Sequence, residues 1–245
     1  YGEGFYQRSD GTVASGRTRS LAQLRRKIWE AQDLDGSPLH PLATPETKQP
    51  DLMSVYALSK YYQEQLCLLL GRAYSLPTVA LRFFNVYGPR QALSNPYTGV
   101  LAIFASRYLN GNPPLIFEDG LQRRDFVSVY DVCRACRLAL ETDTTEGEVF
   151  NIGSGTAYTI LDVAERMAQV LGTSHLKPIL TGSYRIGDIR HCFADIQKAR
   201  RILGYEPQHS LSEALTDLAQ WLEGRVSYDN VDCAHAELAE RGLTV

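Results

Sequence analysis

A tyrosine and a lysine four residues apart form the first pattern in this sequence that could carry chemistry. Tyr56 and Lys60 begin a segment that predicts a helix running to about Tyr74, and residues four apart on a helix share one face. A free phenol gives up its proton only near pH 10, but a neighbouring ammonium favours the phenolate. The pair could therefore exchange a proton near neutral pH, although the same spacing also occurs on ordinary solvated helices.

Strand-like and helical segments alternate after this helix. The β-branched and aromatic run at 78–84 predicts a buried strand, and Asn85–Arg90 predicts a turn-rich loop. Further strands are expected at 115–117, 123–129, 148–152 and 178–180, and further helices at 20–32, 100–109, 131–141, 160–171, 196–203 and 211–222. Asp51 is expected to cap the helix that bears Tyr56, with Val55, Leu58, Tyr62, Leu66 and Leu69 or Leu70 as its core stripe. This alternation predicts an α/β protein with a parallel sheet, in which chemistry lies beyond the carboxyl ends of the strands.

Three ordered motifs resemble those of the extended short-chain dehydrogenase/reductases. They are Tyr56-x-x-x-Lys60, Leu81-Arg82-Phe83-Phe84-Asn85-Val86-Tyr87-Gly88-Pro89 and Arg124-Asp125-Phe126-Val127. Within this family the chain is similar to the NAD-dependent sugar-nucleotide epimerases and dehydratases from residue 1 to about 224. The segments 95–104 and 187–195 are most similar to the dTDP-L-rhamnose 4-epimerase branch.

The resemblance implies a Rossmann-like, doubly wound parallel sheet, present here as its C-terminal part, and a smaller α/β substrate domain. Residues 1–90 would be the remainder of the NAD-binding domain, with an insertion at about 7–49 that serves as a lid or an oligomer contact. Residues 91–224 would mainly bind the sugar nucleotide, with some segments returning to the sheet, and 225–245 would be a tail. In the branch that the chain resembles, this insertion carries cysteine pairs that could hold a metal, whereas no cysteine precedes Cys67 here, so the order of the insertion is in doubt. Pro38, Pro41, Pro45 and Pro50 also interrupt the chain repeatedly.

The resemblance also implies that the glycine-rich dinucleotide turn of the relatives would precede Tyr1. The 245 residues by themselves are therefore expected to bind NAD poorly and to be inactive. Gly153-Ser154-Gly155, after a strand-like run, has the order of a phosphate loop. However, Tyr158 stands where the third glycine would fall, which favours a structural turn.

The resemblance implies catalytic and cofactor roles for a few residues. Tyr56 would be the acid/base at the sugar hydroxyl, and Lys60 would bind the nicotinamide ribose. Phe83 would line the nicotinamide, and Phe84 the sugar, although both also fit a plain strand core. Tyr56 and Lys60 are thus expected both to be catalytic and to contact the cofactor, NAD.

The resemblance implies substrate contacts in several segments. The expected substrate-binding residues are Phe84, Asn85, Gly99, Val100, Leu115, Phe117, Arg124, Arg185, Asp188 and Cys192. Asn85, the helix start at Gly99 and Val100, and the two arginines would bind the diphosphate. Leu115 and Phe117 would flank the nucleobase, Asp188 would contact the ribose, and Cys192 would gate the sugar pocket.

Composition excludes several classes of function. A net charge of −3 predicts no general affinity for nucleic acid, and no apolar run reaches the roughly 18 residues of a membrane span. Five sparse cysteines favour a reducing cytoplasm over a disulfide scaffold, and no metal site is expected, since Cys133 and Cys136 fall on one helix without a second pair. The resemblance implies a homodimer.

The sequence thus predicts an NAD-dependent 4-epimerase of a nucleotide sugar, with dTDP-L-rhamnose as the first candidate substrate. Three alternatives stay open. They are a UDP-glucose or UDP-N-acetylglucosamine 4-epimerase, a sugar-nucleotide 4,6-dehydratase, and a truncated module that binds a nucleotide without catalysis. The residues implied for these activities overlap, so the sequence alone does not separate them.

Overall fold

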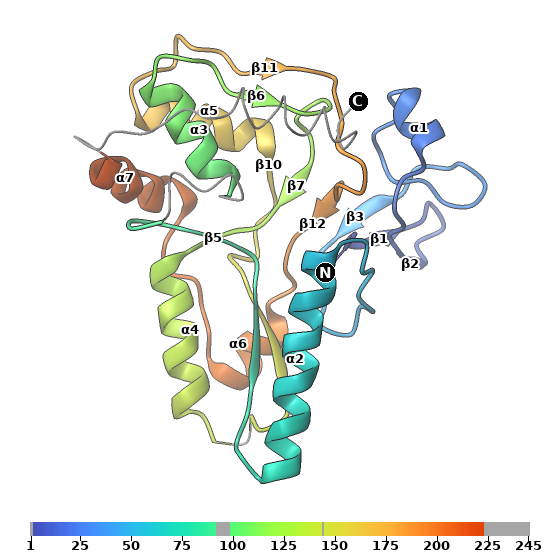
Figure 1. Ribbon diagram of the computed structural model, residues 1–245, viewed down its shortest axis with the longest axis vertical. Helices are drawn as coiled ribbons and strands as arrows, with labels where there is room; N and C mark the ends of the chain where they lie inside the picture. The colour runs from blue at the N-terminus through green and yellow to red at the C-terminus, as the bar shows by residue number, and fades with distance from the viewer. Residues whose placement is uncertain (1, 92–98, 144, 223–245) are drawn as a thin grey trace.

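The computed structural model describes residues 2–91, 99–143 and 145–222. The helices are α1 (Leu21–Arg25), α2 (Val55–Tyr74), α3 (Val100–Leu109), α4 (Val129–Glu141), α5 (Ile160–Val170), α6 (Gln197–Leu203) and α7 (Leu211–Leu222). The strands are β1 (Phe5–Gln7), β2 (Val13–Ser15), β3 (His40–Leu42), β4 (Ala80–Phe83), β5 (Asn85–Tyr87), β6 (Leu115–Ile116), β7 (Arg123–Arg124), β8 (Phe126–Ser128), β9 (Val149–Ile152), β10 (Tyr158–Thr159), β11 (Ile179–Leu180) and β12 (His191–Cys192). Figure 1 shows α2 and α4 on either side of the strands in one half, and α3, α5 and α7 gathered in the other.

The predicted α/β class is confirmed by parallel strand pairs. β4 runs parallel to β9, and β5 runs parallel to β8, with Asn85 opposite Phe126. β6 and β11 are also parallel, and β7 lies between β12, its parallel neighbour, and β10, its antiparallel neighbour. Connections that return to a strand in the same direction need a crossover, which the intervening helices supply.

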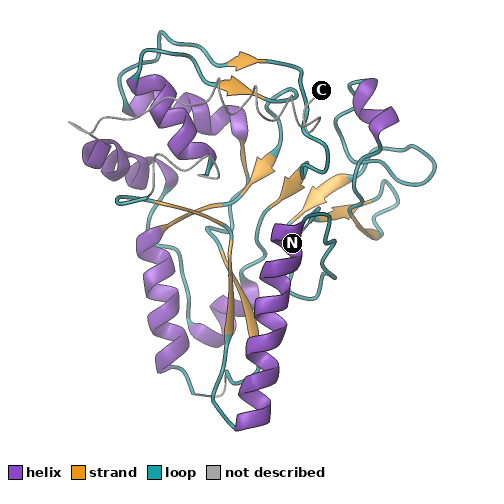
Figure 2. Ribbon diagram, viewed as in Figure 1, coloured by secondary structure: helices purple, strands orange, loops and turns teal. Residues whose placement is uncertain are grey.

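Two apolar cores hold these layers together. One lies between α3, α5 and α7 and includes Phe104, Met167 and Leu215. The other lies between the β4–β9 pair and the helices α4 and α6, and includes Phe150 and Leu203. Figure 2 shows the same division, with helices packed on both sides of the strands. The buried apolar surface in each core supplies the main stabilising contribution.

The helix α2 has the predicted extent but a different cap and a different buried face. Ser54, not Asp51, is the N-cap, because its hydroxyl accepts a hydrogen bond from the N–H of Ala57 at 3.1 Å. Its buried residues are Glu64, Leu68 and Gly71. Most of the predicted core stripe is exposed instead, by 85% at Val55, 54% at Leu58, 61% at Tyr62, 57% at Leu69 and 42% at Leu70. The described chain covers only the opposite side of the helix.

Tertiary contacts override three other expectations. The helix predicted at 20–32 is limited to α1, because Lys27 takes a left-handed conformation (φ 56°) and the chain turns so that Trp29 contacts Tyr184. Asn85–Tyr87 forms strand β5 rather than a loop, since β8 supplies a pairing partner. The strand predicted at 123–129 is divided into β7 and β8 at the buried Asp125.

The segment 7–49, whose order was in doubt, is folded. Strands β1, β2 and β3 form an antiparallel sheet in the order β2-β1-β3, and α1 lies beside it (Figure 1). Tyr6, Ala14, Ala31 and Leu39 form a small core beneath the sheet. The sheet is joined to the rest of the molecule near β12, where Gly4 N–H donates to the carbonyl of His191 at 2.8 Å.

Candidate active site

Tyr56 and Lys60 lie on one face of α2, as their spacing predicts. The Lys60 ammonium is 5.7 Å from the centre of the Tyr56 ring, and it also donates to the side chain of Gln63 at 3.4 Å. The Tyr56 side chain is 71% exposed. A substrate can therefore approach the hydroxyl, but the described residues do not enclose it.

A partly buried ion pair fixes α2 against strand β4. The Arg82 guanidinium donates from Nε and Nη2 to the Glu64 carboxylate at 2.7 and 2.8 Å, and the Glu64 side chain is only 4% exposed. The next residue, Phe83, is 46% exposed at the carboxyl end of β4, whereas Phe84 packs against the core beside β9. Phe83 is thus accessible to a ligand at the edge where the Tyr56 helix meets the sheet.

A cavity of about 100 Å³ brings together three of the predicted substrate residues. It is lined by Asn85, Val86, Gln91, Gly99, Val100, Leu101 and Phe126. Gly99 is the N-cap of α3, and no side chain of the described residues caps this helix start. A Cβ added at Gly99 would meet no described atom within 4 Å. The start of α3 therefore borders a space where an anion would be stabilised, while Asn85, which also lines it, donates its side-chain amide to the carbonyl of Asp125.

Asp125, for which the sequence analysis predicted no role, holds the 153–155 turn and contacts Asn85. Its buried carboxylate accepts hydrogen bonds from Ser154 N–H (2.6 Å), Ser154 Oγ (2.8 Å), Gly155 N–H (2.9 Å) and Ala194 N–H (3.3 Å). Its carbonyl accepts from the side-chain amide of Asn85 at 2.8 Å. Burial raises the pKa of Asp125, although these donors oppose that effect. The signal available in the sequence was the position of this acidic residue inside the Arg124-Asp125-Phe126-Val127 motif.

The donors on Asp125 also decide the role of the Gly153–Gly155 turn. The N–H groups of Ser154 and Gly155, which would have to face a phosphate, are both hydrogen-bonded to the carboxylate. A Cβ at Gly153 would lie 2.5 Å from Asp125 Oδ2, so glycine is required by the close approach. The segment is therefore a structural turn and not a dinucleotide loop.

The predicted nucleotide-binding residues lie on neighbouring loops. The Arg185 guanidinium is 5.8 Å from the centre of the Phe117 ring, and Leu115 pairs with Ile179 in the β6–β11 sheet. Asp188 N–H bonds the carbonyl of Arg185 at 3.2 Å. The Arg185 contact places this loop beside Phe117, the residue that follows β6.

The Arg124 guanidinium is hydrogen-bonded to backbone carbonyls and is therefore not poised to bind a phosphate. Its guanidinium donates to the carbonyls of Arg123 and Arg190 at 2.9 Å and to that of Ile189. Binding a diphosphate would require at least part of this backbone contact to be replaced. In the structure Arg124 holds the segment before β12, and a direct role on phosphate stays a prediction.

Cys192, predicted to gate the sugar pocket, lies on β12 beside the segment 44–48. Burial raises the pKa of its thiol. The neighbouring Lys48 is 7% exposed, and its ammonium has no hydrogen-bond partner among the described residues. Burial also lowers the pKa of Lys48, because it disfavours the charged ammonium. Sequence reasoning did not identify Lys48, because nothing in its neighbours marks it as buried.

Comparison with known proteins places this geometry in context. The sequence model of the NAD dependent epimerase/dehydratase family matches residues 35–153. The chain is 36% identical to the dTDP-L-rhamnose 4-epimerase of Burkholderia thailandensis over 230 residues, which are 94% of this chain and 62% of that protein. It is 30% identical to the UDP-glucose 4-epimerase of Mycolicibacterium smegmatis over 220 residues, or 88% of this chain and 68% of that one.

The fold is shared with solved epimerases as well. The UDP-glucose 4-epimerase of Thermotoga maritima with UDP-glucose superimposes with a TM-score of 0.67 at 38% identity, covering 74% of this chain and 57% of that one. This likeness confirms the predicted Rossmann-like fold. The chain spans 62% of the length of the Burkholderia protein and 57% of the Thermotoga protein.

Proposed function

Since the chain belongs to the NAD dependent epimerase/dehydratase family, we propose that it serves the 4-epimerisation of a nucleotide sugar, with NAD as cofactor and dTDP-L-rhamnose as substrate. The observation that carries this proposal is the cavity shared by Asn85, Gly99 and Val100. The helix start in this cavity has no side-chain cap among the described residues and would bind a diphosphate through its backbone N–H groups, so no cluster of positive side chains is needed. Asn85 would add its side-chain amide by sharing it between the diphosphate and the carbonyl of Asp125. The choice of dTDP-L-rhamnose is supported by the 36% identity over nearly the whole chain.

The residues near Tyr56 fit the nicotinamide end of NAD. Lys60 offers an ammonium next to an exposed aromatic ring, and Phe83 is an exposed apolar side chain at the carboxyl end of a parallel strand. NAD, when bound, would supply the hydride acceptor and donor. Tyr56 would take the proton from the sugar hydroxyl and return it, while Lys60 would bind the nicotinamide ribose.

The diphosphate and nucleobase would occupy the second half of the site. Asn85 and the start of α3 would bind the diphosphate, together with Arg185, while Arg124 would join them only if it released its backbone carbonyls. We also propose that Leu115 and Phe117 flank the base, that Asp188 contacts the ribose, and that Phe84 and Cys192 border the sugar. The same geometry would serve a UDP-sugar, which is the alternative that the likeness to UDP-glucose 4-epimerases favours.

Proton NMR at the sugar C4 position tests this proposal. The full-length protein, saturated with NAD, is incubated with dTDP-L-rhamnose in one experiment and with UDP-glucose in another. Inversion at C4 of dTDP-L-rhamnose, lost in Tyr56→Phe, is expected. Inversion of UDP-glucose alone would change the substrate, and inversion of neither would refute the epimerase proposal. A separate titration with NAD checks the expectation that these 245 residues bind it weakly, since the 153–155 turn is occupied by Asp125.

We further propose that the protein forms a homodimer through the exposed face of α2. Val55, Leu58 and Tyr62 present a continuous apolar strip there, and such strips on a helix commonly mark an interface. Light scattering after size-exclusion chromatography should show a dimer that Leu58→Glu converts to a monomer. The free thiols of Cys67, Cys133, Cys136 and Cys192 are consistent with a cytoplasmic location, which is likewise proposed. Among the described residues, none of the helices combines the length and the hydropathy of a membrane span.

A further inference from the structure

A network of buried charges joins the segment 7–49 to the loops expected to bind the nucleotide. Arg19 donates two hydrogen bonds to the Glu118 carboxylate, at 2.8 and 2.9 Å, and both side chains are 2% exposed. Glu118 Oε2, which accepts one of these bonds, also accepts from Arg190 at 2.9 Å. Arg19 and Arg190 lie 99 and 72 positions from Glu118 in the sequence. The network therefore links three distant parts of the chain.

Glu118 holds an unusual backbone conformation at the centre of this network. Its φ is +56°, in the left-handed region that residues other than glycine rarely adopt. Such a conformation persists only when the surroundings impose it. Here the two arginines hold the side chain, and the Glu118 N–H bonds the carbonyl of Ser183 at 2.8 Å. The turn that follows Phe117 is thus set by Arg19 and Arg190 together.

The second arm of the network runs from Glu30 to the segment before β12. The Glu30 carboxylate accepts from Arg190 Nη2 at 2.6 Å and lies 2.8 Å from His191 Nε2. His191 Nδ1 accepts from the N–H of Arg123 at 3.1 Å, so Nε2 carries the ring proton and donates to Glu30. Arg190 is fully buried and also bonds Asp119 at 2.7 and 3.0 Å.

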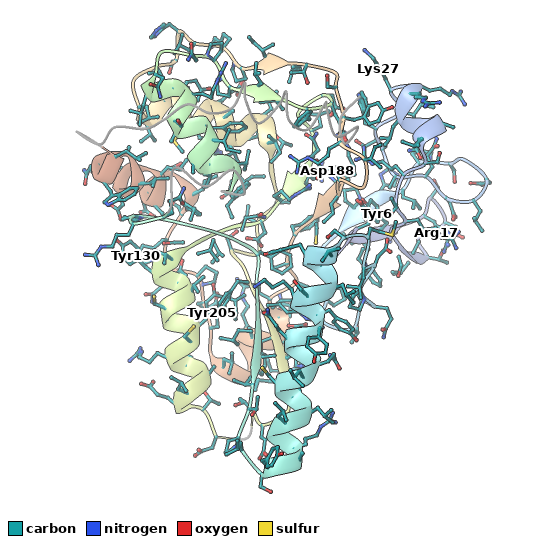
Figure 3. All side chains as sticks on the ribbon, in the orientation of Figure 1. Tyr6, Arg17, Lys27, Tyr130, Asp188 and Tyr205 are labelled. Carbon is teal, nitrogen blue, oxygen red and sulfur yellow. The ribbon has the colours of Figure 1, made fainter. Side chains whose placement is uncertain are left out.

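The loops held in this way are those that carry the expected nucleotide contacts. Phe117 precedes Glu118 directly, and the Arg185 guanidinium lies over its ring. The carbonyl of Asp188 accepts a further hydrogen bond from Arg19 at 3.1 Å. Figure 3 labels Asp188 and Tyr6 where this segment meets the β1–β3 sheet. A shift of Arg19 would therefore move both sides of the nucleotide site.

We propose that Arg19 and Glu30 are positioning residues for nucleotide binding. Arg19 holds the Phe117–Glu118 turn, and Glu30 holds Arg190 behind the Arg185–Asp188 segment. The segment 7–49 thereby acts as a brace for the nucleoside end of the substrate rather than as a lid over the reacting sugar. This inference rests on the proposed nucleotide-sugar site.

Calorimetric titration of Arg19→Met with dTDP and with UDP tests the brace. The nucleotide dissociation constant should rise tenfold or more, while turnover of the full-length protein at saturating nucleotide sugar should change less than threefold, because Arg19 does not touch the reacting groups. Arg19→Lys keeps the charge without the two-pronged contact and should give an intermediate dissociation constant. Arg8→Met is the matched control: it removes an ion pair with Asp33 inside the same segment and should leave binding within twofold.

Hydrogen exchange provides a readout that requires no ligand. The Glu118 amide should exchange faster in Arg19→Met than in Arg8→Met, because its bond to Ser183 depends on the held turn. If Arg19→Met does not fold, Glu30→Gln replaces it, since the Glu30 side chain is 44% exposed and its change is milder; nucleotide binding should weaken severalfold. Wild-type affinity and exchange in the variant that folds would overturn the proposal. Failure of the wild-type protein to bind either nucleotide would refute the proposed function, and the exchange experiment would still decide whether the brace exists.

Discussion

Replacing Asp125 by asparagine should destabilise the fold through two backbone amides. Four donors converge on this carboxylate, two on each oxygen. In Asp125→Asn one oxygen can still accept from Ser154, but the new NH₂ faces the N–H groups of Gly155 and Ala194. An unsatisfied buried N–H costs about 1–3 kcal/mol, so the two together cost about 2–6 kcal/mol. Because burial raises the pKa of Asp125, losing the buried charge returns part of this cost, and we expect a net loss of about 2 kcal/mol.

Urea unfolding followed by circular dichroism measures this loss. For a domain of this size 2 kcal/mol corresponds to a fall in Tm of about 4–8 °C. Asp195→Asn is the control, because Asp195 accepts a single hydrogen bond from the N–H of Gln197 at 2.9 Å and asparagine serves equally well there. The free energy of unfolding of Asp195→Asn should stay within about 0.5 kcal/mol of wild type. If Asp125→Asn behaves like this control, the 153–155 turn does not depend on the carboxylate.

Three further predictions concern charges outside that turn. Lys48→Met should raise the urea midpoint, since it removes a buried ammonium that lacks a partner among the described residues; a lower midpoint would contradict this. Arg82→Met should cost about 3–5 kcal/mol of unfolding free energy, because it leaves the buried Glu64 carboxylate unpaired. The double variant Arg82→Met/Glu64→Leu should recover most of this loss. If the single and the double variant lose the same unfolding free energy, pairing of the Glu64 carboxylate does not matter for stability. Lowering the pH should weaken the brace in two steps, measured by the urea midpoint. Burial lowers the pKa of His191, so its contribution is complete above about pH 6.5 and is lost below it. Burial opposes ionisation of Glu30, but hydrogen bonds from His191 and Arg190 outweigh it and hold the pKa at about 2, so its contribution is lost between about pH 4.5 and 2. Glu30→Gln should make the second step smaller, with a remainder from Asp119, whose pKa is also lowered by hydrogen bonds from Arg190 that outweigh its burial.

A neutral His191 adds a hydrogen bond to Glu30 but no charge. The low pKa of Glu30 therefore results from the His191 hydrogen bond together with the hydrogen bonds and the charge of the buried Arg190 guanidinium. Replacing Arg190 would remove both the charge and the contact, and it would also take away the second guanidinium that donates to Glu118.

The elements predicted correctly from the sequence are those whose position is indicated by residues within the element or next to its ends. Helices α3 and α7 have the expected ends, because their apolar periodicity and the signals at their termini agree. The prediction of which side of α2 is buried was wrong, because apolar residues at helical spacing do not reveal which face has neighbours. Asn85–Tyr87 was likewise predicted to be part of a loop, but pairing with β8 makes it strand β5.

The candidate site was predicted in part for the same reason. Asn85, Gly99 and Val100 belong to motifs and do line one cavity. Asp125 stood inside a motif, but its role depends on donors from residues 154, 155 and 194 that only the fold brings together. The charges on Arg19 and Glu30 resembled ordinary surface residues in the sequence, because their partners are 99 and 160 positions away.

The contact between Glu3 and the start of β12 has a consequence for biosynthesis. The N–H groups of Arg190 and His191 donate to the Glu3 carboxylate at 2.9 and 2.8 Å across a separation of 187 and 188 residues. Strand β1 leaves the ribosome long before the residues that anchor it have been translated. The β1–β3 sheet must therefore wait, with Glu3 still in water, and it can dock only after translation has passed β12, so a nascent chain stalled earlier should leave this region open to proteases.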